Sequence, residues 1–386
     1  MRSLFLIVLL LSLSVGFSTN AGYMFFFILL FLSSIRIVRL KMKFYFSNKI
    51  EDYIALFFFL VWLYGFIRGI ILDNNITYIV ANFAGMICYL FYFMLSLFRI
   101  SKNEIELIIL NASLFICLYS ILGFISFIGG LNIPFYENNA YVTPDGQLRV
   151  MYFTTATIVY PLLGYSYYSF ISNLKKTNWM SSYSFLFLLL SIFSLCIITA
   201  SKGFILGCLI ILGGITIIVL FRAIVRLKMN ASILISSFIL IFFSVLLYFL
   251  DYWLLVENLF SSEASGNSVR YDQLYYMLDD LSFWGKGLGA TISGIVRSQD
   301  APYGFELTYI NLIHKFGVFS LFLFGGWAYM FFRSICILWK SKNIESVIVF
   351  SSLGYMFPSI GNPLLMHPTL VLLNCLTLYL IKIYPR

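Results

Sequence analysis

Long apolar runs dominate the chain and alternate with short polar stretches. Most of the runs extend for about 20 residues, the length of an α-helix that crosses the hydrocarbon core of a bilayer. The runs are continuous, without the alternation of apolar and polar residues that marks the strands of a membrane β-barrel. Because backbone groups in lipid must be hydrogen-bonded within the protein, the pattern predicts transmembrane helices.

The pattern therefore predicts an all-α, polytopic membrane protein with about 12 transmembrane helices. The expected spans are residues 3–19, 21–35, 53–72, 77–98, 105–128, 150–172, 183–200, 203–221, 231–250, 307–332, 346–360 and 368–383. The runs at 21–35 and 346–360 are short and are also compatible with re-entrant helices. Arg2 and the run after it resemble a signal peptide, but no small-residue cleavage site follows Gly16, so we expect an uncleaved first helix.

Composition supports this class and excludes others. Hydrophobic residues make up 61% of the 386 residues and charged residues 11%, whereas soluble domains are about half apolar and a quarter charged. The net charge of +9 does not indicate nucleic-acid binding, because the basic residues form short clusters and no nucleic-acid motif is present. The six cysteines form no CxxC pair and are interpreted as small apolar residues.

The basic residues predict the orientation of the helices. Lysine and arginine collect on the cytoplasmic side of membrane proteins. In the twelve-span arrangement, 18 of the 25 basic residues fall on one side, together with both termini. We therefore expect both termini in the cytoplasm. The outer side holds seven basic residues, which are Arg68, Arg149, Lys202, Arg270, Lys286, Arg297 and Lys315.

Two outer connections are long in this arrangement. Residues 1–386 are expected to form a single transmembrane domain, with a smaller loop at 129–149 and a large loop subdomain at 251–305. Loops on a rigid scaffold often hold functional residues. In the large loop, apolar and aromatic residues at 271, 274, 275 and 278 follow helical spacing. They predict a short amphipathic helix that lies on the outer face of the membrane and also contains Arg270. A solvated loop helix is the simpler interpretation of Arg270 taken alone.

A glycine-rich stretch and a charged helix follow. Gly285, Gly287 and Gly289 favour either tight turns or a close approach of the backbone to a ligand. Glu306 is expected at the outer start of the tenth span, with His314 about 12 Å further along the same helix and about 80° round it. A first-turn acid that interacts with the helix dipole is the simpler interpretation of Glu306, and a packing histidine that of His314.

The outer cations suggest an anionic ligand. Arg149 and Lys202 lie at the ends of expected spans, where each alone is also compatible with an interfacial anchor. Several cations at one membrane face, each beside a polar turn, favour an anionic head group, and arginine binds phosphate in a bidentate manner.

Five segments together resemble one family. Arg149 precedes an aromatic run, Thr199–Gly203 reads T-x-S-K-G, and Arg270–Leu274 reads R-x-x-x-L. Trp284–Gly289 contains G-x-G, and Glu306–Leu312 reads E-L-x-Y-I-N-L. In this order, and with a large loop late in the chain, the motifs resemble the Wzy-type O-antigen polymerases, which are related to the O-antigen ligases. Ligases of this group usually have a histidine where this chain has Glu306, so the resemblance favours a polymerase.

No Asp-rich cluster lies on the apolar runs, so we expect transfer without a metal ion or another cofactor. The resemblance implies a membrane glycosyltransferase. It would join oligosaccharide repeat units carried on undecaprenyl pyrophosphate, at the periplasmic face of the bacterial inner membrane, in lipopolysaccharide biosynthesis. Membrane lipid and a chain-length regulator are the implied partners. The candidate catalytic residues are Glu306 and Arg270. The candidate substrate-binding residues are Arg149, Lys202, Arg68, Tyr271, Lys286, Arg297, Tyr309 and His314. The alternatives are an O-antigen ligase, another surface-polysaccharide polymerase, and a flippase for lipid-linked oligosaccharides.

Overall fold

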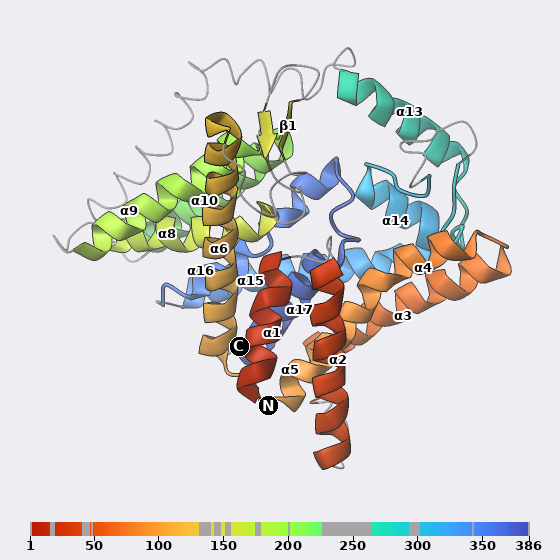
Figure 1. The fold of residues 1–386 in the computed structure, drawn as a ribbon, viewed down its shortest axis with the longest axis horizontal. Helices are drawn as coiled ribbons and strands as arrows, with labels where there is room; N and C mark the ends of the chain where they lie inside the picture. The colour runs from red at the N-terminus through yellow and green to blue at the C-terminus, as the bar shows by residue number, and fades with distance from the viewer. Residues whose placement is uncertain are drawn as a thin grey trace. The chain divides into compact units, whose positions relative to one another are not determined.

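The computed structural model is predominantly helical (Figure 1). It describes residues 2–15, 20–40, 47, 49–130, 140–142, 148–150, 156–173, 179–199, 201–225, 265–292, 302–341 and 343–384. The chain divides into two compact units. The first unit comprises Met1–Ile105, Ser261–Arg333 and Ser359–Arg386, and the second comprises Glu106–Phe260 and Ser334–Pro358. The expectation of one transmembrane domain stays a prediction.

The first unit contains nearly all of the residues discussed below. Its helices are α1 (Arg2–Val15), α2 (Asn20–Leu40), α3 (Ile50–Ile71), α4 (Ile76–Ala84), α5 (Leu90–Leu97), α13 (Ser265–Asp279), α14 (Thr308–Phe316), most of α15 (Ser320–Lys340) and α17 (Pro368–Ile383). A 3₁₀ turn at Gly85–Tyr89 joins α4 to α5, and another at Gly317–Phe319 joins α14 to α15.

The second unit is built around closely packed helices. Its elements are most of α6 (Lys102–Gly129), β1 (Ala140–Val142), β2 (Leu148–Val150), α8 (Tyr160–Asn173), α9 (Trp179–Ile192), α10 (Lys202–Val225) and α16 (Ser346–Ser351). Glycines allow close approach here: a Cβ at Gly164 would lie 2.5 Å from Cβ of Ser351, and one at Gly214 would lie 2.8 Å from the ring of Phe350. Small residues at such contacts are typical of helix packing in membranes.

Helices overlap every expected span except 231–250, which lies outside the described residues. Within the described part of the chain, five helices are long and apolar enough to cross a membrane: Ile50–Ile71, Ile76–Leu97, Lys102–Gly129, Gly203–Val225 and Thr308–Lys340. The prediction of a helical membrane protein is confirmed at this level. The number of crossings and the orientation stay predictions.

The surface of these helices supports the same conclusion. Large apolar side chains are exposed along them, among them Phe27 and Phe31 on α2, Ile71 on α3 and Leu321 on α15. Soluble monomers rarely expose contiguous apolar surface of this kind, because its contact with water is unfavourable. Lipid is the solvent that these faces require.

Helix α17 forms the centre of the first unit. It packs on α1, α3 and α5, and its residues from Thr369 to Ile381 are buried on all sides (Figure 1). A helix that is apolar all round is expected in such a position. At its C-terminal end, Nζ of Lys382 lies 2.6 Å from Oδ1 of the buried Asp52 at the start of α3. This ion pair ties the two helices together.

Two local expectations were wrong. The sixth span was expected to begin at residue 150, but residues 148–150 form β2, which pairs antiparallel with β1 and sets Arg149 opposite Tyr141. The tenth span was expected as one uninterrupted helix over 307–332. The apolar helical stretch Thr308–Lys340 covers it, but the helix is interrupted at Gly317, whose φ is +56°. The break has a physical cause: the chain at Gly317 lies so close to Phe283 that a side chain would collide with the Phe283 carbonyl oxygen.

Candidate functional site

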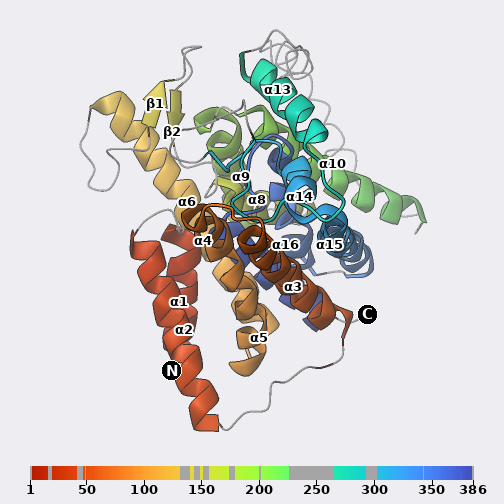
Figure 2. The same cartoon turned by 90° about the vertical axis from the view of Figure 1, so that its right-hand side faces the viewer.

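The inner face of α13 packs against α14 and the segment before it (Figures 1 and 2). Arg270, Gln273 and Met277 lie three and four residues apart, so they share one side of the helix. Gln273 and Met277 are fully buried, and Met277 forms a small core with Ile292 and Phe305. The apolar contact therefore fixes the side of α13 from which Arg270 projects.

Arg270 forms an ion pair with Glu306. Its Nε donates to Oε2 of Glu306 at 2.8 Å, and the two side chains are 34% and 19% exposed. The Glu306 backbone N–H donates to Oε1 of Gln273 at 3.0 Å. Gly361 lies beside the guanidinium, because a Cβ added there would be 3.4 Å from Nε of Arg270. Both predicted catalytic residues are therefore brought together and remain partly accessible.

Glu306 lies immediately before the N-cap of α14. Helix α14 begins at Thr308, with Leu307 as its N-cap, so Glu306 precedes the helix rather than opening its first turn. The expected helical spacing between Glu306 and His314 does not apply. The two residues have different partners, since His314 contacts Asp280.

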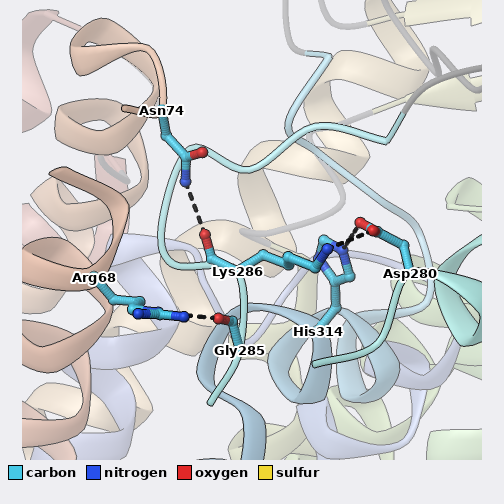
Figure 3. A network of polar contacts seen from close by, with 6 residues as sticks. All are labelled: Arg68, Asn74, Asp280, Gly285, Lys286 and His314. Carbon is cyan, nitrogen blue, oxygen red and sulfur yellow. Dashed lines mark hydrogen bonds and ion pairs between the residues drawn. The ribbon is translucent and has the colours of Figure 1, made fainter. Parts of the chain in front are cut away.

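A second polar network surrounds Asp280, just after α13 (Figure 3). Nζ of Lys286 lies 2.6 Å from Oδ1 of Asp280, and Nε2 of His314 lies 2.9 Å from Oδ2. Because a carboxylate only accepts, His314 donates through Nε2. In the neutral ring this leaves Nδ1 as an acceptor. The network joins the end of α13 to the end of α14.

The glycine-rich loop is seated on backbone groups of the protein itself. Lys286 and Gly287 donate their N–H groups to the carbonyl oxygens of His314 (2.8 Å) and Lys315 (2.9 Å). Leu288 donates its N–H to the Gly65 carbonyl of α3 at 2.8 Å. The loop therefore completes hydrogen bonds at the C-terminal end of α14, where helix carbonyls otherwise lack partners.

Side chains of α3 and of the turn after it hold the same loop (Figure 3). Nε of Arg68 donates to the Gly285 carbonyl at 3.3 Å, and the Tyr64 hydroxyl donates to the Trp284 carbonyl at 2.6 Å. Nδ2 of Asn74 donates to the carbonyls of Lys286 and Leu288, each at 2.9 Å. Arg68 was expected to bind the substrate. Its side chain instead donates a hydrogen bond to the backbone of this loop.

The three glycines allow the loop to approach the backbone of neighbouring segments closely. Gly285, Gly287 and Gly289 have φ of +75°, +77° and +74°, a region that other residues rarely adopt. A Cβ at Gly287 would lie 2.6 Å from Cα of Gly69. The positive φ angles agree with the tight turns that the sequence offered as one interpretation, and the close approach is to the protein's own backbone.

Lys315 is fully buried beside this loop. Its Nζ donates to Oδ1 of Asn82 at 2.5 Å and to the Tyr303 carbonyl at 3.0 Å. Asn82 Oδ1 also accepts from the Gly289 backbone N–H at 3.2 Å. This lysine, assigned to the outer cations by sequence, links three segments of the first unit.

Buried polar atoms without hydrogen-bond partners lie on both facing helices. They are Nε2 of Gln273 on α13, and Oδ1 of Asn311 and Nδ1 of His314 on α14. Such atoms are uncommon in folded proteins and costly. Among the described residues, one of these atoms is a donor without an acceptor and two are acceptors without a donor. The boundary between α13 and α14 is therefore the best candidate for a functional site in the described residues.

No family model, curated protein or solved structure matches this chain.

The remaining predicted residues have different positions. Tyr271 is exposed on the outer side of α13, and the Tyr309 ring on α14 lies 6.0 Å from that of Phe324. Arg149 in β2 and Lys202 at the start of α10 belong to the second unit, and their side chains are outside the description. Arg297 lies outside the described residues. In the part of the chain that is described, no three His, Cys, Asp or Glu residues group as metal ligands would.

Three polar residues of the site were missed by sequence reasoning. Asp280 was not singled out, although it follows Gln273 by seven residues and so continues the inner side of α13. That spacing was the signal available for it. Asn74 and Gln273 gave no signal, because they act through backbone groups far away in the sequence.

Replacing Asp280 with asparagine is expected to weaken this network in a pH-dependent way. Burial raises the pKa of Asp280, but the contacts with His314 and Lys286 lower it by more, so the pKa lies below its usual 3.8. The stabilisation is thus complete above about pH 4 and is lost as the pH falls through the lowered pKa. Since the carboxylate is partly exposed, we expect about 1 kcal/mol or less.

The measurement is the thermal unfolding midpoint of both proteins in detergent at pH 7 and at pH 3. The Asp280→Asn protein should unfold at a lower temperature at pH 7, and the difference should shrink at pH 3. An equal difference at both pH values would show that the charge of Asp280 does not stabilise the fold.

Proposed function

We propose that the protein is a polysaccharide polymerase of the O-antigen type. It joins oligosaccharide repeat units carried on undecaprenyl pyrophosphate, at the periplasmic face of the bacterial inner membrane. The observation that supports this most is the partly exposed Arg270–Glu306 pair, which sets a carboxylate beside a guanidinium at 2.8 Å. Lipid-facing helices supply the membrane setting that a polyprenyl substrate needs.

The reaction requires a base and a cation at one place. A hydroxyl oxygen of the acceptor sugar forms a bond to the anomeric carbon of the donor, and the bond from that carbon to the pyrophosphate oxygen breaks. Glu306 accepts the hydroxyl proton, as a general base must. Arg270 stabilises the negative charge that develops on undecaprenyl pyrophosphate, since a guanidinium offers five N–H donors suited to phosphate oxygens.

The buried polar atoms extend the proposal to sugar recognition. Nε2 of Gln273 on α13, and Oδ1 of Asn311 and Nδ1 of His314 on α14, have no hydrogen-bond partner among the described residues. Sugar hydroxyls both donate and accept hydrogen bonds, so they match such a mixed set. We assign Arg270 and Glu306 to the chemical step. Arg149 and Lys202 stay candidates for pyrophosphate binding, with a chain-length regulator as a further partner.

The proposal is tested with purified protein in lipid nanodiscs, supplied with lipid-linked repeat units. Polymer ladders and free undecaprenyl pyrophosphate should form, and excess chelator should leave the rate unchanged. Transfer without a metal ion is a prediction from the sequence, which has no Asp-rich cluster on its apolar runs. Loss of ladders in chelator alone would overturn only that part. Absence of ladders under all conditions would overturn the proposed function.

A further inference from the structure

The outer face of α13 is unusually rich in tyrosine. Tyr271, Tyr275 and Tyr276 are 51%, 71% and 42% exposed, and we call these three residues the tyrosine face. The rings of Tyr275 and Tyr276 meet edge to face, with centroids 5.5 Å apart. At about 100° per residue, Tyr271 and Tyr275 lie about 40° apart on the helix and Tyr276 about 100° further round. The three rings therefore border one surface, on the side away from the buried Gln273 and Met277.

Two exposed carboxylates lie among these rings. Asp272 and Asp279 are seven residues apart, hence about 20° apart around the helix, and both are exposed. Their angular positions fall between those of Tyr275 and Tyr276. The one basic residue of α13 is Arg270, whose Nε points to Glu306 on the inner side. The tyrosine face thus combines aromatic rings with hydrogen-bond acceptors of negative charge.

This chemistry disfavours two common occupants of an exposed aromatic face. Helices that lie on membranes have lysine and arginine on their polar side and are attracted to anionic lipids, whereas Asp272 and Asp279 would be repelled. Cores of protein interfaces are enriched in tyrosine but depleted of aspartate. Neither a lipid surface nor a protein partner therefore matches both residue types.

A carbohydrate chain matches both the aromatic rings and the carboxylates of this surface. A sugar ring has an apolar C–H face that packs on an aromatic ring, and hydroxyls at its rim that donate to carboxylates. Ligand sites of this type combine aromatic walls with a few well-placed polar groups. The tyrosine face also lies on the same helix as Arg270, so a chain bound there stays next to the Arg270–Glu306 pair.

We propose that the tyrosine face of α13 binds the glycan of the lipid-linked substrate, away from the reacting end. This inference rests on the proposed function and adds a second substrate-binding surface to it. A glycan held by the tyrosine face dissociates more slowly between additions. Longer chains, which cover more of the face, benefit most.

Chain length is the first measurement. In a strain that lacks the endogenous gene, Tyr275→Ala and Tyr276→Ala are expected to halve the modal number of repeat units, or reduce it further. Tyr275→Phe keeps the ring and should give ladders of normal length. Tyr183→Ala is the matched control, because Tyr183 on α9 is similarly exposed at 55%. Ladders of normal length in both alanine variants would overturn the proposal.

The location of the tyrosine face is the second measurement. A fluorophore is attached to Leu278→Cys, because Leu278 is 52% exposed beside Tyr271 on the helix but is not part of the tyrosine face. The background is Cys336→Ser, since Cys336 is exposed whereas the other five cysteines are buried. In nanodiscs of phosphatidylethanolamine and phosphatidylglycerol, aqueous iodide should quench it and spin-labelled lipid should not. Repeat-unit oligosaccharide, released by mild acid from the strain's own polysaccharide, should protect it from iodide by at least twofold.

The outcomes distinguish a failure of the glycan-binding surface from a failure of the polymerase assignment. Quenching by spin-labelled lipid, or no protection by the oligosaccharide, would overturn the glycan-binding surface while the polymerase assignment stands on the ladder assay. If the wild-type protein forms no ladders, the proposed function fails, and the oligosaccharide protection alone then decides whether the tyrosine face binds sugar.

Discussion

Polymer ladders should disappear when Glu306 is replaced with glutamine, with protein levels unchanged. Glutamine keeps the shape and the hydrogen-bonding length of the side chain but has no carboxylate to accept a proton. Loss of a general base typically lowers a rate by about 10²–10⁴-fold. The measurement is the ladder in a strain that lacks the endogenous gene, with an immunoblot of the membrane fraction to confirm that the variant is present.

The structural role of the Arg270–Glu306 ion pair must be distinguished from the catalytic role of Glu306. Glu306 also anchors α13, because its carboxylate lies 2.8 Å from Nε of Arg270. The double variant Arg270→Glu, Glu306→Arg restores an ion pair with the charges exchanged. We expect it to recover the thermal stability lost in either single variant and to remain inactive. Glu104→Gln is the matched control, since it breaks the exposed Arg2–Glu104 pair (2.5 Å) and should leave ladders intact.

Ladders that persist in Glu306→Gln would show that Glu306 is only an anchor for α13. Recovery of activity in the charge-exchanged variant would lead to the same conclusion, because an arginine cannot act as a general base at that position. The proton would then need another acceptor. Nδ1 of His314, which has no partner among the described residues, would be the next group to test.

The positions of the helices were predictable because lipid imposes a length on every apolar run. The break at Gly317 was not, since it depends on a long-range contact. The Val318 N–H donates to the Phe283 carbonyl at 2.9 Å, and Phe283 belongs to a loop far away in the sequence. Nothing in the apolar pattern of 307–332 encodes that contact. The hairpin around Arg149 was also not predictable, because strands of three residues are too short to give a recognisable apolar pattern.

The candidate site was predictable in its residue types and much less in its pairings. Arg270 and Glu306 were both singled out, because a charged residue at a membrane face is rarely neutral in function. Their contact was not foreseen, and neither was the contact of His314 with Asp280. From the sequence, the outer basic residues formed one group, defined only by their expected side of the membrane. Lys286 and Arg68 are instead bound to groups of the same unit, which an inventory of charges does not reveal.

Replacing Gly287 with alanine is expected to release the glycine-rich loop from its seat. Alanine at a φ of +77° costs about 1–3 kcal/mol of backbone strain. Its Cβ would also lie 2.6 Å from Cα of Gly69, and overpacking against rigid backbone adds about 1–3 kcal/mol. The measurement is hydrogen exchange at the N–H groups of Lys286, Gly287 and Leu288, which bond to carbonyls of α14 and α3. We expect their exchange to accelerate by at least about 30-fold, corresponding to about 2 kcal/mol.

Alanine substitutions at two other glycines distinguish backbone strain from steric collision. Gly130 has a φ of +62° with no atom within 4 Å of an added Cβ, so Gly130→Ala tests backbone strain without a collision. Gly325 in α15 also has free space and no positive φ, so Gly325→Ala should not lower the stability of the protein. If the loop glycines instead existed to admit a ligand, Gly287→Ala would lower activity while the exchange of the loop amides stayed as in the wild type. Accelerated exchange in Gly287→Ala, beyond that seen around position 130 in Gly130→Ala, would show that close backbone packing is what requires a glycine there.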